Sequence, residues 1–178
     1  MLNTESQNCI LKTLEEPPEF VTFILIASNE SLLLNTIKSR CMILKFKDIP
    51  DDLIKKFAIE NLGYNELSKN QIKFFRGSIG NCIKYKDKSE KFFMIEELIN
   101  NLSKKDIIDI MLNAKIIYDK ENIYDILDYI IVCLYEMDNR KRLNCIKYVN
   151  ECITKLKANA NFDMSIDTLL FKISKELS

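Results

Sequence analysis

Arginine is scarce in this chain, and the arginine at position 40 stands where it could contact a bound anion. Only Arg40, Arg76, Arg140 and Arg142 are arginines among the 26 basic residues. Arg40 lies in the run Ser39-Arg40-Cys41, between a short helical pattern and an apolar segment. A planar guanidinium can hold two phosphate oxygens at once, whereas a lysine ammonium acts as a point charge. We therefore take Arg40 as a candidate anion-binding residue, and a surface arginine without a special role is the alternative.

Several kinds of chemistry are excluded by composition. The chain has no histidine, so it has no Ser-His or Cys-His nucleophile pair and no histidine metal ligand. Its six cysteines form no C-x-x-C pair, and we expect reduced thiols in a cytoplasmic protein rather than a metal site. No segment is long and apolar enough to span a bilayer.

The charge balance is equally informative about partners. The chain has 26 acidic and 26 basic residues, which argues against a protein that mainly binds the phosphate backbone of nucleic acids. Residues 139–142 (NRKR) form a local basic run, which could contact a nucleic acid or an acidic partner. A solvated turn is the other interpretation of this run.

The first 48 residues have the pattern of mixed α/β structure. A helix must end before Pro17-Pro18, because proline disfavours helical geometry in the residue before it. Residues 21–26 are an apolar, partly β-branched run that predicts a buried strand. Residues 31–38 read as a short helix, and residues 42–46 alternate as a second strand. A helix, a strand, a helix and a strand in this order favour α/β architecture.

The remainder of the chain reads as helices. All three prolines and all three glycines lie between residues 17 and 80, so turn signals of this kind are missing beyond that point. Gly63 is placed to end a helix, and Ser68-x-x-Gln71 is a capping-box pattern that begins the next. We predict three short helices over residues 49–87 and longer helices over residues 88–178, whose apolar stripes form a core or a subunit interface.

These runs resemble those of a known family. Residues 6–18 (SQNCILKTLEEPP) resemble the helix and LEEPP element of bacterial clamp-loader ATPase subunits. Residues 23–29 are similar to their sensor 1 strand, and residues 36–41 (TIKSRC) to their SRC motif, in the same order and spacing. Residues 156–161 (LKANAN), with the apolar positions that follow, resemble the last collar helices of the same subunits.

The resemblance implies a mainly α fold in three parts. Residues 1–48 would be the C-terminal part of an α/β AAA+ ATPase domain, residues 49–87 a three-helix lid, and residues 88–178 an all-helical collar that holds the oligomer together. Because the resemblance is already under way at Met1, we expect the chain to be part of a longer protein.

The resemblance also implies a site. Arg40 would be an arginine finger that reaches ATP bound by the neighbouring subunit, with Ser39 and Cys41 as its SRC context. Ser28 and Asn29 would be the weaker nucleotide contacts of the sensor 1 region. ATP and Mg²⁺ would be held by the neighbour, so that this chain would carry no cofactor and no metal of its own.

The implied partners are the gamma/tau and delta subunits of the loader, through the collar and the ATPase interface. The sliding clamp and primer-template DNA would be reached through the assembled complex, and no membrane is implied. The complex belongs to the DNA polymerase III holoenzyme, whose role is DNA replication.

The sequence has no G-x-x-x-x-G-K-S/T phosphate loop, so we expect no catalysis by this chain alone. Two other departures from the family pattern favour its delta-prime branch, which does not hydrolyse ATP itself. Residues 27–29 (ASN) keep only part of the polar pair usual in the sensor 1 region. The turn Gly77-Ser78 lacks the sensor 2 arginine after the serine, and Arg76 precedes it instead. The gamma/tau ATPase branch is the alternative, and a helical scaffold or nucleic-acid-binding protein is a third interpretation.

Overall fold

The computed structural model describes residues 3–104, 107–137 and 140–178. The chain divides into two compact units, residues 1–47 (the N-terminal unit) and residues 48–178 (the helical unit). Each is described by itself below. Within the described residues, no helix has the length and apolar character needed to cross a bilayer.

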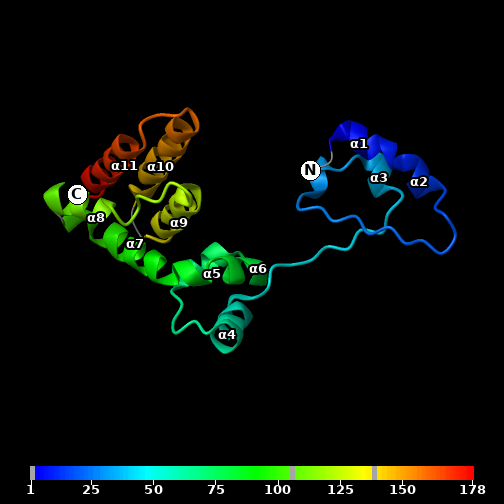
Figure 1. The fold of residues 1–178 in the computed structure, drawn as a ribbon, viewed down its shortest axis with the longest axis horizontal. Helices are drawn as coiled ribbons and strands as arrows, with labels where there is room; N and C mark the ends of the chain where they lie inside the picture. The colour runs from blue at the N-terminus through cyan, green and yellow to red at the C-terminus, as the bar shows by residue number, and fades with distance from the viewer. Residues whose placement is uncertain (1–2, 105–106, 138–139) are drawn as a thin grey trace. The chain divides into compact units, whose positions relative to one another are not determined.

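The N-terminal unit consists of short helices joined by extended chain (Figure 1). Helix α1 spans Thr4–Cys9, and the Asn3 side chain caps it by accepting the backbone N–H of Ser6 at 2.8 Å. Helix α2 follows over Leu11–Glu15 and ends before the two prolines, as predicted. The 3₁₀ helix η1 (Glu30–Leu32) and helix α3 (Asn35–Lys38) complete the unit.

The two predicted strands are the main correction to the expected fold. Residues 21–26 and 42–46 are extended, but the described part of the chain contains no strand. A strand must pair its backbone groups with a neighbour about 5 Å away, and in the described residues neither segment forms such a pairing. Their apolar side chains are correspondingly exposed, with Ile24 at 82% and Phe46 at 94%. The α/β expectation for residues 1–48 is therefore wrong for this structure, whereas the mainly helical class is confirmed.

The helical unit begins with the three predicted short helices. They are α4 (Asp51–Leu62), α5 (Lys69–Phe75) and α6 (Ile79–Lys84). Gly63 ends α4 in the left-handed region, at φ 71°, where an L side chain is disfavoured. The capping box before α5 is also formed, since Ser68 Oγ accepts the Gln71 backbone N–H at 3.1 Å and Gln71 Oε1 accepts that of Ser68 at 3.0 Å.

Longer helices follow in the same unit. In chain order they are η2 (Lys86–Lys88), α7 (Ser89–Asn101), η3 (Leu102–Lys104), α8 (Ile107–Ala114), α9 (Ile123–Glu136), α10 (Arg142–Lys157) and α11 (Phe162–Leu177). Helix α9 packs against α5, α7 and α10, and α10 lies beside α11 (Figure 1). Half of the residues of α9 are buried, which makes it the centre of the unit.

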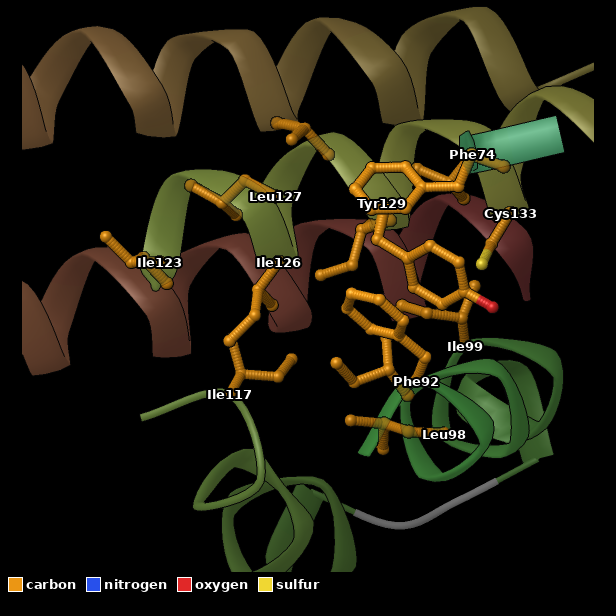
Figure 2. Packing of buried hydrophobic residues seen from close by; sticks show 14 of the residues in the cluster. Phe74, Phe92, Leu98, Ile99, Ile117, Ile123, Ile126, Leu127, Tyr129 and Cys133 are labelled. Atoms are coloured by element: carbon orange, nitrogen blue, oxygen red, sulfur yellow. The ribbon is translucent and has the colours of Figure 1, made fainter. Parts of the chain in front are cut away.

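Aromatic rings join α5, α7 and α9. Phe92 stacks on Tyr129 with ring centroids 4.2 Å apart, and Phe74 meets Tyr129 edge-on at 5.1 Å (Figure 2). Aromatic pairs of this kind contribute about 0.5–1.5 kcal/mol beyond the area that they bury. The first three helices and the later ones therefore share one core, and the expected boundary between lid and collar near residue 87 stays a prediction.

Two glycines of the helical unit differ in their surroundings. Gly77 has φ +61°, and a Cβ there would lie 2.5 Å from the Cβ of Asp48 and 2.7 Å from the nitrogen of Ile49. The Ile49 N–H also donates to the Gly77 carbonyl at 3.1 Å, so the first residues of the unit are bound to the α5–α6 turn. Gly63, at φ +71°, has open space around it.

We predict that Gly77→Ala destabilises the helical unit more than Gly63→Ala does. Both substitutions force a side chain into left-handed backbone, which costs about 1 kcal/mol. Only the first also displaces Asp48 and Ile49, which adds about 1–3 kcal/mol. Urea unfolding followed by circular dichroism measures both, and equal losses would contradict the close approach at Gly77.

Asp119 ties α7 to the start of α9. Its carboxylate accepts from Lys91 Nζ at 2.6 Å and from the backbone and side-chain N–H groups of Asn122 at 3.1 Å. The hydrogen bond from the Lys91 ammonium lowers the pKa of Asp119 from 3.8 to about 2. The carboxylate form is thus favoured in the folded state.

This contact predicts a pH-dependent contribution to stability. Because the folded pKa of Asp119 is depressed, its contribution is present above pH 5 and is lost as the pH falls towards about 2. Asp119→Asn should lower the free energy of unfolding at pH 7 by about 1 kcal/mol and flatten its decline below pH 5. The control is Asp128→Asn on the exposed face of α9, and equal acid profiles for wild type and Asp119→Asn would refute the assignment.

Candidate functional site

Arg40 lies directly after the end of α3, on a backbone fixed by a buried residue. Its N–H donates to the carbonyl of Ile37 at 3.0 Å. Ile37 is only 2% exposed and is the apolar residue that holds this turn in the N-terminal unit. The Arg40 side chain itself remains 33% exposed. The backbone is therefore fixed while the guanidinium can be reached from solvent.

The Arg40 guanidinium makes three contacts, all through its two terminal nitrogens. Nη1 donates to the carbonyl oxygen of Thr36 at 2.8 Å and to Ser39 Oγ at 3.3 Å. Nη2 forms an ion pair with Glu15 Oε1 at 2.5 Å. A guanidinium has five N–H donors, so at least two are left for a further anion.

The two flanking residues of the SRC run have different surroundings. Ser39 Oγ donates to the Thr36 carbonyl at 3.0 Å and accepts from Arg40, so it lies within the arginine's contacts. Cys41 is a half-buried free thiol. It lines a hollow of about 370 Å³ in the N-terminal unit instead of contacting the guanidinium.

Ser28 and Asn29 are not brought to Arg40. Ser28 lines the same hollow as Cys41, among mostly apolar side chains. Asn29 caps η1, where its Oδ1 accepts the backbone N–H of Ser31 at 2.9 Å and the Ser31 hydroxyl at 2.8 Å. The structure therefore gathers Ser39 with Arg40 and Ser28 with Cys41, in two groups.

One ion pair lies at the hollow. Lys45 Nζ is 2.7 Å from Glu30 Oε2, and this hydrogen bond lowers the pKa of Glu30. Both side chains are largely exposed, and such pairs contribute little to stability.

Gln7 has a different role from the one that its sequence pattern predicts. The spacing Thr4-x-x-Gln7 indicates a capping box, whereas Asn3 caps α1 in the structure. Gln7 is a buried polar side chain, 5% exposed, on α1. Its Nε2 donates to the Leu32 carbonyl and its Oε1 accepts the Leu34 N–H, both at 3.0 Å. These bonds bind α1, which precedes the helix of Glu15, to the segment before α3, which precedes Arg40.

The other arginines serve structural roles or lie on the surface. Arg76 ends α5 in left-handed backbone, at φ 50°. Arg142 donates to the carbonyls of Tyr135 and Met137 at 3.0 and 3.2 Å, and so caps the end of α9. This contact favours the interpretation of residues 140–142 as a solvated turn, and Asn139 lies outside the described residues. Among the described residues, no group of three or more His, Cys, Asp or Glu side chains could hold a metal ion.

The accessible guanidinium of Arg40 is suited to bind an anion. The guanidinium offers a fixed, accessible charge, but the sequence lacks the glycine-rich loop that would surround phosphates. Such a side chain is suited to complete a site whose other components come from another chain.

Comparisons with known proteins found similarity over parts of the chain. Residues 1–50 match the family described as DNA polymerase III, delta subunit. The DNA polymerase III gamma subunit of Buchnera aphidicola subsp. Acyrthosiphon pisum is 37% identical over 89 residues, which are 47% of this chain and 25% of that protein. The tau subunit of Escherichia coli is 44% identical over 55 residues, 31% of this chain and 9% of that protein.

One relative aligns along most of this chain. The gamma subunit of Buchnera aphidicola subsp. Baizongia pistaciae is 27% identical over 160 residues, covering 85% of this chain and 39% of that protein. This chain therefore spans between 9% and 39% of the length of these three relatives. No solved structure matches it.

We predict that Gln7→Ala loosens the backbone that supports Arg40. Without the side-chain amide, the Leu34 N–H loses its acceptor, and a hydrogen bond of this kind contributes about 0.5–1.5 kcal/mol. Hydrogen exchange of the Leu34 amide should become roughly three- to tenfold faster. Glu5→Gln, an exposed change on the same helix, is the control, and an unchanged Leu34 exchange rate in Gln7→Ala would contradict the contact.

Proposed function

We propose that this chain, which shows partial homology to the DNA polymerase III clamp-loader family, is a delta-prime-like subunit of the bacterial replicative clamp loader. Its Arg40 would complete the ATP site of a neighbouring subunit. The observation that carries the proposal is that the Arg40 guanidinium is bound on one side and accessible to solvent on the other. The guanidinium is fixed by Thr36 and Glu15, yet a third of the side chain is exposed.

Phosphoryl transfer explains why such a residue is needed. Negative charge develops on the oxygens around the γ-phosphate, and an arginine supplied in trans can accelerate hydrolysis by roughly 10³–10⁵. Arg40 would supply that charge, and the Thr36 carbonyl and Ser39 hydroxyl would keep its side chain in one direction. The neighbouring subunit would hold ATP and Mg²⁺.

Two features support the delta-prime assignment. The turn at Gly77-Ser78 has no arginine after its serine, and residues 27–29 (ASN) keep only part of the polar pair usual in the sensor 1 region. Arg76, the nearest arginine, is used as the left-handed C-cap of α5. Cys41, Ser28 and Asn29 support a nucleotide role less. Asn29 caps η1, and the other two line a hollow that has its own ion pair, and neither is among the hydrogen-bond partners of the Arg40 guanidinium described above.

The gamma/tau ATPase is the second candidate, and the comparisons supply the reason. The relatives that align with this chain are named gamma or tau, while the matching family is described as delta. An ATPase of that kind requires a phosphate loop in the same polypeptide as Arg40, so a G-x-x-x-x-G-K-S/T sequence upstream of residue 1 in the full protein would favour this candidate.

Assembly would rest on the helical unit. Helices α10 and α11 expose large apolar side chains, among them Leu143 at 67% and Phe171 at 49%. Exposed apolar surface of this kind is suited to contacts with other subunits. The partners would be the gamma/tau and delta subunits, with the sliding clamp and primer-template DNA bound by the assembled loader. The balanced charge of the chain and the capping role of Arg142 weigh against the interpretation as a nucleic-acid-binding scaffold.

We predict that Arg40→Ala strongly reduces ATP hydrolysis by a reconstituted loader that contains this chain. At the site completed by Arg40, single-turnover hydrolysis should slow by roughly 10³-fold or more, because the charge on the γ-phosphate loses its partner. Arg140→Ala, in an exposed turn of the helical unit, is the matched control.

Two readouts separate the possible outcomes. Size-exclusion chromatography should show that both variants still assemble, and clamp loading should fall with Arg40→Ala alone. Undiminished hydrolysis and loading by an assembled Arg40→Ala loader would remove the arginine-finger assignment.

A further inference from the structure

The ion pair between Arg40 and Glu15 joins two runs that are 25 residues apart in the chain. Glu15 is the last residue of α2, and Arg40 follows α3. Glu15 Oε1 accepts from Nη2 at 2.5 Å, while the opposite terminal nitrogen donates to the Thr36 carbonyl at 2.8 Å. The guanidinium is thus held from two sides by acceptors on different elements.

The backbone around Glu15 and Arg40 is held in place by other contacts. Gln7 binds α1 to the segment before α3 through two hydrogen bonds of 3.0 Å. Helix α2 follows α1 almost directly, with Ile10 between them. The position of Glu15 relative to Arg40 is therefore set by contacts other than the ion pair itself.

The energetics of the pair indicate orientation more than stability. The side chains are 33% and 48% exposed, and an ion pair in such surroundings adds little to the folded state. An arginine side chain, however, has several rotatable bonds whose freedom must be lost when it meets a phosphate. A carboxylate that already restricts those bonds reduces this cost at the moment of reaction.

We infer that Glu15 is a positioning residue, which holds the Arg40 guanidinium in the direction from which it contacts a phosphate on another chain. The inference rests on the function proposed above for Arg40. Glu15 needs no protonation or covalent step for this role, since it acts only through the side chain that it binds. Glu16, the adjacent carboxylate, is exposed and serves as the matched control.

The test is a double-mutant cycle in the reconstituted loader. Glu15→Gln should lower kcat for ATP hydrolysis by about five- to tenfold with an unchanged KM for ATP, because the finger acts in the transition state. Glu16→Gln should leave both parameters within about twofold of wild type. In an Arg40→Ala background, Glu15→Gln should have no further effect, because Glu15 acts through Arg40.

Each outcome has a distinct meaning. If Arg40→Ala has no effect, the proposed function fails. If Arg40→Ala is impaired but Glu15→Gln behaves like Glu16→Gln, the positioning role alone fails. If Glu15→Gln is equally harmful with and without Arg40, Glu15 acts on the structure and the inference is overturned.

A second measurement uses the full chain without its partners. Nitrogen-15 NMR of the arginine side chains reports the mobility of the Arg40 guanidinium. Glu15→Gln should raise that mobility and Glu16→Gln should not. Equal mobility in wild type and Glu15→Gln would overturn the inference whatever the state of the reconstituted loader.

Discussion

The two hydrogen bonds of the buried Gln7 amide are the interaction on which the candidate site depends. Through them, α1 is bound to the segment that leads into α3. A buried amide without partners would cost about 1–3 kcal/mol, so this arrangement strongly favours one register of the two segments. That register brings Glu15 to Arg40 and leaves the guanidinium with donors to spare. The site therefore depends on one buried polar contact within the N-terminal unit.

The helical unit is stable for a different reason. Its core is centred on α9, where Phe74 and Phe92 pack against Tyr129 (Figure 2). The polar atoms at the edge of this core have hydrogen-bond partners, since the Glu96 carboxylate accepts from the Ser68 and Tyr129 hydroxyls. A unit of this kind can present surface for assembly while the N-terminal unit supplies the charged group. The proposed function divides between the two units in the same way.

The helices of this chain could be predicted from its sequence because their signals are local. Gly63 and the Ser68-x-x-Gln71 pattern end and begin helices within a few residues, and the apolar spacing of residues 123–136 marks a buried helix. Whether an apolar run forms a strand could not be predicted in the same way. An apolar run such as residues 21–26 forms a strand only if another segment pairs with it, and pairing is not a local property.

The candidate site also shows this difference between local signals, which the sequence reveals, and contacts between distant residues, which it does not. Arg40 was selected from its rarity in the composition and from the resemblance of residues 36–41 to the SRC motif, and its role stays a prediction. Its partner Glu15 could not be found, because a separation of 25 residues gives no periodic signal. The pattern Thr4-x-x-Gln7 indicated a capping box, whereas Asn3 caps α1 and the Gln7 amide is buried. Ser28 and Asn29 were expected beside the nucleotide, whereas Asn29 is used to cap η1.

The central claim concerns where the Arg40 guanidinium lies when a neighbouring subunit holds a nucleotide. It is tested most directly by the structure of a loader assembled with this chain in the presence of Mg²⁺, ADP and a fluoride mimic of the transferred phosphate. Our account predicts that Arg40 nitrogens lie within hydrogen-bond distance, about 3 Å, of the mimic on the adjacent subunit. An assembled loader in which Arg40 faces solvent, away from any nucleotide, would contradict it.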